Sequence, residues 1–108
     1  MAFKTSISKK RDFDLIYKRG ISYKDGFLII RFIKNDLDYS RLSFVISQKV
    51  SKSAVKRNRI RRVLKEATKD YLKAFNKNID SILIVCPGFE ESKANNSVEN
   101  IFKKAKLI

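Results

Sequence analysis

KVSKSAVKRNRIRRVLKEA, residues 49–67, is the stretch of this 108-residue chain that says most about its fold. Within and just beyond it, apolar residues recur at intervals of three and four, from Ile60 through Leu64 and Ala67 to Phe75. This spacing is typical of an amphipathic helix with one buried face. We therefore expect a long helix from about Ala54 to Phe75.

The same stretch is densely basic. It contains eight lysines and arginines and one acid, so it carries seven of the chain's fourteen net positive charges. At about 100° per residue, most of these cations fall on a stripe beside the apolar one. Like charges at this density destabilise a folded protein unless a polyanion neutralises them, so nucleic acid is the expected partner. The candidate contact residues are Lys49, Lys52, Lys56, Arg57, Asn58, Arg61, Arg62 and Lys65.

A basic helix face is more often plain solvated surface than a binding site. Two features favour binding here: few acids are placed for i to i+4 pairing, and arginine, whose planar fork suits phosphate, predominates. Asn58 is a poor helix former that the apolar pattern does not require, so we expect it to make a directed hydrogen bond.

Outside this helix the sequence predicts five further elements in a single α+β domain, residues 1–108. A short helix is expected from about Ser8, its cap, to Arg19, with Gly20 ending it. Alternating apolar residues predict strands over 27–34 and 41–47, joined as an antiparallel hairpin. Residues 80–86, which are all apolar from Ile82 onward, predict a central strand. A closing helix is expected around Val98 to Ala105.

Composition excludes several kinds of function. The chain has no histidine, which removes the commonest general base and zinc ligand, and its aspartates are dispersed without a ligand spacing. We assign no catalytic and no metal-ligating residue to the chain. Cys86, in an apolar run, is expected to be a small buried side chain. No apolar run is long enough to span a bilayer and no secretion signal is recognisable, so we expect a cytoplasmic protein without a membrane partner.

Residues 47–62, SQKVSKSAVKRNRIRR, resemble a known signature, S-K-K-x-G-x-A-V-x-R-N-x-x-K-R. That signature belongs to the protein subunit of bacterial ribonuclease P. The order of the expected elements is also similar, and the resemblance extends from RDFDLIYKRG, residues 11–20, to the final IFKKAKLI. The chain departs from the pattern at Gln48, at the loop Ser51–Ser53 and at Arg31.

The resemblance implies an α-β-β-α-β-α sandwich with a small mixed sheet, like domain 2 of ribosomal protein S5. It further implies a left-handed βαβ crossover through the long helix, although such connections are generally right-handed. The function it implies is removal of the 5′ leader from precursor tRNA by metal-assisted hydrolysis. The partners would be ribonuclease P RNA, which would carry the catalytic centre and bind most of the Mg²⁺, and precursor tRNA.

The resemblance also implies roles for particular residues. The basic residues of the long helix and Lys49 would face the RNA subunit, and Phe13 and Tyr17 would bind the leader in a cleft between the first helix and the sheet. Arg31 stands where relatives can carry an aromatic, so it would contact a phosphate or stack as a guanidinium. Aromatic faces beside cations also suit unstacked nucleotides in general. Without the resemblance, aromatics at i and i+4 such as Phe13 and Tyr17 are more often core.

Two alternatives remain from the residues alone. A small ribosomal protein that only stabilises ribosomal RNA would carry the same charge. A DNA-binding domain is less favoured, because a hairpin is expected before the basic helix, where a helix-turn-helix would place another helix. We therefore expect no DNA partner.

Overall fold

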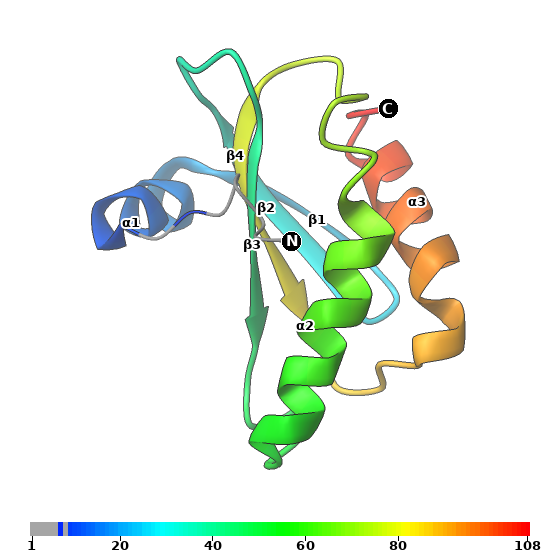
Figure 1. The fold of residues 1–108 in the computed structure, drawn as a ribbon. Helices are drawn as coiled ribbons and strands as arrows, with labels where there is room; N and C mark the ends of the chain where they lie inside the picture. The colour runs from blue at the N-terminus through cyan, green and yellow to red at the C-terminus, as the bar shows by residue number, and fades with distance from the viewer. Residues whose placement is uncertain (1–6, 8) are drawn as a thin grey trace.

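The computed structural model describes residue 7 and residues 9–108, which fold into helices on both faces of one sheet (Figure 1). The elements, in chain order, are α1 Lys10–Arg19, β1 Ile21–Asp25, β2 Leu28–Lys34, β3 Arg41–Ile46, α2 Ala54–Thr68, β4 Ile79–Val85, the short 3-10 helix η1 Glu91–Lys93 and α3 Ala94–Lys104. The predicted α+β class is confirmed. No helix among these described residues is long and apolar enough to cross a membrane.

The sheet has four strands in the order β1-β2-β4-β3. β4 pairs antiparallel with β2 and parallel with β3, so it is central as predicted. The predicted hairpin of β2 and β3 is wrong, because β4 inserts between them. The burial of β4 explains this: six of its seven residues are buried, and such a strand is most stable between two neighbours.

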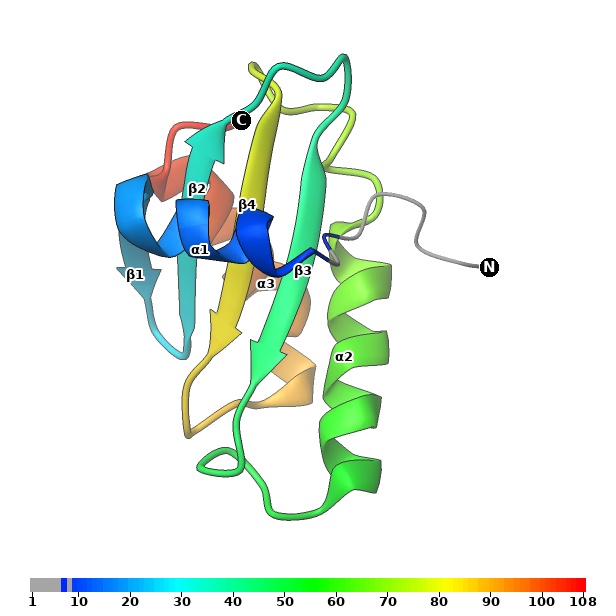
Figure 2. The ribbon, with the colours of Figure 1, turned by 90° about the vertical axis from the view of Figure 1, so that its left-hand side faces the viewer.

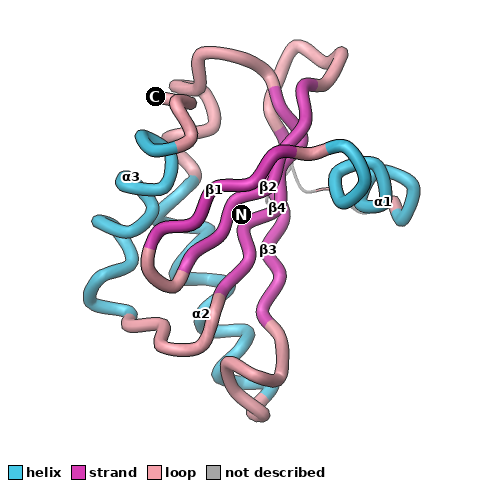
Figure 3. Tube along the Cα trace, turned by 180° about the vertical axis from the view of Figure 1, so that it is seen from behind, coloured by secondary structure: helices cyan, strands magenta, loops and turns pink. Residues whose placement is uncertain are grey.

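β2, β3 and β4 each divide their side chains between two apolar layers. From β2, Leu28, Ile30 and Phe32 enter the main core beneath α2 and α3, while Ile33 packs toward α1 on the other face. α1 lies across the sheet on that second face, with strands visible on both sides of it (Figure 2). The reverse view shows the same separation of α1 from α2 and α3 (Figure 3).

The connection from β3 through α2 to β4 is left-handed, as the resemblance implied. In Figure 2 both strands point down, β4 lies to the left of β3, and α2 lies on the face away from the viewer. This sense is rare among parallel βαβ units. It places α2 beside β3, which is an edge strand of the sheet.

Several boundaries differ from the predictions. β1 was not predicted, because it is a short edge strand with few apolar residues and mostly exposed side chains. α2 ends at Thr68, and Phe75 reaches the core from the turns that follow, where its ring lies 4.9 Å from that of Phe102. Cys86 is only partly buried. The predicted cap Ser8 lies outside the described residues, and α3 begins earlier than expected, at Ala94.

Candidate functional site

The basic residues of α2 other than Arg59, together with Asn58 and the lysines of the loop before the helix, are here called the basic ridge. It comprises Lys49, Lys52, Lys56, Arg57, Asn58, Arg61, Arg62 and Lys65. Ser53 begins the helix, and its hydroxyl accepts a hydrogen bond of 3.2 Å from the Lys56 backbone N–H. The first turn contains no acidic residue. Cations therefore stand at the positive end of the helix dipole, which costs stability in the free protein and favours a bound anion.

Two hydrogen bonds organise the ridge internally. Arg57 Nη1 donates to the Ser51 carbonyl at 2.8 Å and so ties the helix to the loop in which this chain departs from the family signature. Arg61 Nη1 donates to Asn58 Oδ1 at 3.1 Å. The directed hydrogen bond expected of Asn58 is therefore present, and it orients an arginine.

The remaining cations of the ridge differ in how freely they face solvent. Lys49, Lys52, Lys56 and Arg62 are exposed, and none of them makes a side-chain hydrogen bond or ion pair with any described residue. Arg57, Arg61 and Lys65 are half-buried. The ridge thus presents unneutralised charge from both the loop and the helix.

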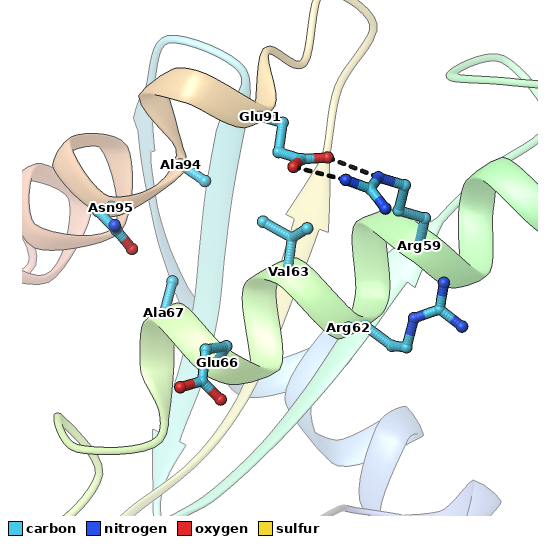
Figure 4. A pocket seen from close by; sticks show the side chains of 8 residues that line it. All are labelled: Arg59, Arg62, Val63, Glu66, Ala67, Glu91, Ala94 and Asn95. Atoms are coloured by element: carbon cyan, nitrogen blue, oxygen red, sulfur yellow. Dashed lines mark hydrogen bonds and ion pairs between the residues drawn. The ribbon is translucent and has the colours of Figure 1, made fainter.

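Arg59 lies on α2 three residues from both Lys56 and Arg62, but its side chain is ion-paired. Its guanidinium donates to both carboxylate oxygens of Glu91, at 2.8 and 2.9 Å, across a pocket of about 410 Å³ between α2 and α3, which Arg62 also lines (Figure 4). The hydrogen bond and charge of Glu91 raise the pKa of Arg59. Both side chains are largely exposed, so the pair adds little stability, but it removes Arg59 from the charge available to a polyanion.

α1 presents the two predicted aromatics on one flank. Phe13 is half-buried against the small core cluster of Ile7, Ile16 and Ile82, so the core interpretation holds for part of its ring. Tyr17 is 48% exposed. The two residues are about 40° apart around the helix, so a surface for stacking is open chiefly at Tyr17.

Arg31 holds the C-terminal end of α1. Its Nε donates to the Ile16 carbonyl at 3.0 Å, Nη2 to the Tyr17 carbonyl at 2.7 Å, and Nη1 to the Ser22 hydroxyl at 2.6 Å. Helix-end carbonyls need such donors. The sequence did not reveal this role, because the contacts join α1, β1 and β2 and β1 itself was not predicted.

A second polar cluster was also missed. Arg41 Nε donates to Asp80 Oδ1 at 2.8 Å, and Asn35 Nδ2 donates to the same oxygen at 2.8 Å. Burial alone would raise the pKa of Asp80, but the hydrogen bonds from Arg41 and Asn35 and the charge of Arg41 hold it below its ordinary value. The cluster lines a pocket of about 380 Å³ on the flank of α1 opposite Phe13 and Tyr17. The sequence did not reveal this cluster, because Asn35 and Asp80 are 45 positions apart and no local pattern connects them.

The carboxylates of this chain do not fit a dedicated magnesium cage. Across residue 7 and residues 9–108, no three Cys, Asp or Glu side chains are grouped to hold a metal ion. Asp80 and Asp12 both face the guanidinium of Arg41, which is directed mainly at Asp80. Mg²⁺ prefers few carboxylates supplemented by water and phosphate oxygens.

Known proteins resemble the chain over almost its whole length. The family model for ribonuclease P matches residues 1–106. The ribonuclease P protein component of Clostridium kluyveri is 38% identical over 107 residues, which cover 94% of each chain. That of Alkaliphilus metalliredigens is 31% identical and covers 100% of this chain and 99% of its own. The structure of the Staphylococcus aureus RNase P protein superposes with a TM-score of 0.85 at 31% identity, covering 95% of this chain and 96% of that one.

These likenesses favour ribonuclease P over a small ribosomal protein, because family, sequence relatives and fold all agree. The match includes both the basic ridge and α1. The chain therefore belongs to the ribonuclease P protein family, and its relatives are protein components of that tRNA-processing enzyme.

Proposed function

We propose that the chain, which as a ribonuclease P protein takes part in endonucleolytic tRNA processing, has two RNA partners in the cytoplasm. The basic ridge binds the RNA subunit, and the aromatic flank of α1, Phe13 and Tyr17, binds the single-stranded 5′ leader of precursor tRNA. The catalytic centre lies on the RNA subunit, which binds most of the Mg²⁺. The protein lowers the magnesium requirement by screening phosphate repulsion.

The exposed and unpartnered cations at the start of α2 carry the first part of this proposal. Lys49 and Lys52 precede the helix, and Lys56 and Arg57 are in its first turn, where the helix N-terminus itself favours phosphate. Arg61 and Arg62 extend the positive charge along the next two turns. Arg59 differs from these cations because its guanidinium is ion-paired with Glu91. A structured RNA is the polyanion of matching size and rigidity.

The position of α1 supports the second part. α1 crosses the sheet on the face opposite α2 and α3, and Tyr17 is half exposed there at the helix end that Arg31 fixes. An aromatic ring held by a rigid scaffold can stack an unstacked base of any sequence. A leader varies from one precursor to another, so sequence-tolerant stacking suits it.

Reconstitution with a bacterial ribonuclease P RNA tests the proposed function. Leader cleavage of a precursor tRNA should be much faster at low magnesium with the chain than without it. Replacing Lys56 and Arg62 by Gln should remove most of that gain, whereas Arg59→Gln, which removes one cation of the same helix that is ion-paired with Glu91, should retain it. Equal cleavage with and without the protein would refute the proposal.

The leader contact has a test of its own. Tyr17→Ala should weaken holoenzyme binding to precursor tRNA by about 1 to 3 kcal/mol for a lost stacked base and leave binding of mature tRNA unchanged. Phe13→Ala should act in the same direction and also destabilise the fold, since its ring is part of the core. Circular dichroism on both variants separates these effects. An undiminished preference for precursor over mature tRNA in folded Tyr17→Ala would place the leader elsewhere.

A further inference from the structure

The basic ridge accounts for only part of the positive charge of the chain. Of the net charge of +14, residues 49–67 carry +7, which leaves +7 on the other 89 residues. Several of those cations are paired with glutamates, for example Lys93 with Glu90 and Lys103 with Glu99. A second concentration of unpaired cations would be a second place for phosphate.

Such a concentration surrounds a pocket at the opposite edge of the sheet. Arg19 ends α1, Lys34 ends β2, and Lys77 lies in the loop just before β4, yet all three line one pocket of about 330 Å³. β1 begins at Ile21, opposite Phe32, so Ile33 and Lys34 extend past the end of β1 and leave the pocket open there. Three distant parts of the sequence thus bring one cation each to the same place.

The lining of this pocket distinguishes it from the others. The pockets beside α3 and beside the Arg41–Asp80 cluster both include glutamate or aspartate, whereas this one includes none. Arg19, Lys34 and Lys77 are exposed, and their side chains form no hydrogen bond or ion pair with any described residue. Its apolar part is formed by Ile33, the buried Phe32, and Ile21, which is 53% exposed. Such a lining suits a nucleotide, because the cations can contact the phosphate and the apolar side chains can contact the sugar or base.

We propose that Arg19, Lys34 and Lys77 form a phosphate-binding site for the 5′ leader, beyond the nucleotides that stack on Phe13 and Tyr17. This inference rests on the proposed leader contact. Arg19 and Tyr17 lie two residues apart in the last turn of α1 but about 200° apart around its axis, so a flexible strand leaving Tyr17 reaches Arg19 and the exposed Ile21 by passing over the C-terminal end of the helix. RNA held on the ridge is at the β3 edge, and the site is at the β1 edge, across the whole sheet.

Leader length provides the decisive variable. The variant with Arg19, Lys34 and Lys77 all replaced by Gln is assembled with the RNA subunit, and its affinity is measured for precursors with a graded series of leader lengths. Affinity should fall for long leaders only, and the log-log salt slope for them should drop by about 2, since each single-strand phosphate contact contributes about 0.7. Binding of the RNA subunit, of short-leader precursors and of mature tRNA should not change.

A matched control removes the same number of charges elsewhere. Replacing Lys73, Lys103 and Lys106 by Gln alters three exposed positions on the α3 side of the molecule and should leave the dependence on leader length intact. An equal loss in the control, an equal loss for short and long leaders, or loss of RNA-subunit binding in the site variant would overturn the proposal.

Neutral methylphosphonate linkages in the distal leader provide a second test that needs no protein variant. With the unaltered protein they should reproduce the loss, and combined with the site variant they should add nothing further, because both remove the same contacts. Additive losses would overturn the phosphate site. Tyr17→Ala, in contrast, should weaken short-leader binding as well. If it has no effect while the length-dependent loss persists, the stacking proposal fails and the phosphate site stands.

Discussion

Asn58 and Arg61 lie three residues apart on α2 and share a hydrogen bond on the exposed side of the ridge. We expect Asn58→Ala to leave the free energy of unfolding within about 0.5 kcal/mol, because the side chain is exposed and alanine is the better helix former. Affinity for the RNA subunit should fall about fivefold, which corresponds to about 1 kcal/mol for a lost hydrogen bond. Arg61→Ala should lower affinity too, and the double variant should lose less than the sum.

Asn95→Ala is the matched control for this prediction, since Asn95 is an exposed helical asparagine on α3. Titration of the labelled RNA subunit would measure the affinity, and urea unfolding would measure the free energy of unfolding. Strict additivity of Asn58→Ala and Arg61→Ala would show that the asparagine acts independently of the arginine.

Asp80 is the residue whose titration should matter most for stability. Its pKa is lower in the folded chain than its ordinary value of 3.8, so its ion pair with Arg41 stabilises the fold above that value. This contribution should be lost as the pH falls below 3.8 toward the folded pKa. Asp80→Asn should cost about 2 kcal/mol at neutral pH, because Arg41 loses its main partner in a partly buried site and keeps only the longer contact with Asp12.

Urea unfolding between neutral pH and about pH 3 would check this prediction. The unfolding free energy should decrease less at low pH in the variant, because the contribution from protonation of Asp80 is missing. Asp70→Asn is the control, because Asp70 is exposed. A variant as stable as the unaltered protein would mean that burial of the pair costs as much as the pair contributes.

At the scale of elements, the attachment of α1 depends on Arg31. Arg31→Met keeps much of the aliphatic stem but removes the donors to Ile16, Tyr17 and Ser22. We expect faster amide exchange along α1 and a loss of about 1 to 3 kcal/mol in unfolding free energy. Lys18→Met, at an exposed position of the same helix, should change neither. Unaltered exchange in α1 would mean that the apolar contacts of Ile16 suffice to hold it.

Elements with a strong apolar pattern were predictable from the sequence, and their pairing was not. The periodicity of α2 and the unbroken run of β4 identified both, and the ridge residues followed from helical spacing. Short chain separation suggested that β2 pairs with β3, but the doubly buried β4 pairs with both instead. Only that topology brings Arg31 and Asp80 to their partners and the three cations at the β1 edge to one pocket, so no local pattern marks them.

For the whole molecule, the excess charge should make stability depend on salt. The chain has 25 cations and only 11 acids, so repulsion within its net charge of +14 weakens the free fold, and added salt screens this repulsion. The Tm of the free chain should therefore rise with sodium chloride from low to moderate concentration. Lys56→Gln with Arg62→Gln should have the higher Tm at low salt, and the two proteins should converge as salt increases. Calorimetry that finds a flat Tm would show that the charges are spaced too widely to interact.

The central position of β4 has a consequence for how the protein is made. β4 is the last strand in the chain, and β2 and β3 have no other common neighbour. A ribosome therefore completes α2, with its ridge, before it supplies the strand that joins the sheet. Folding must wait for these long-range pairings, and chains of such topology fold slowly. During synthesis, the basic segment is therefore exposed to the surrounding RNA before the core of the protein has folded.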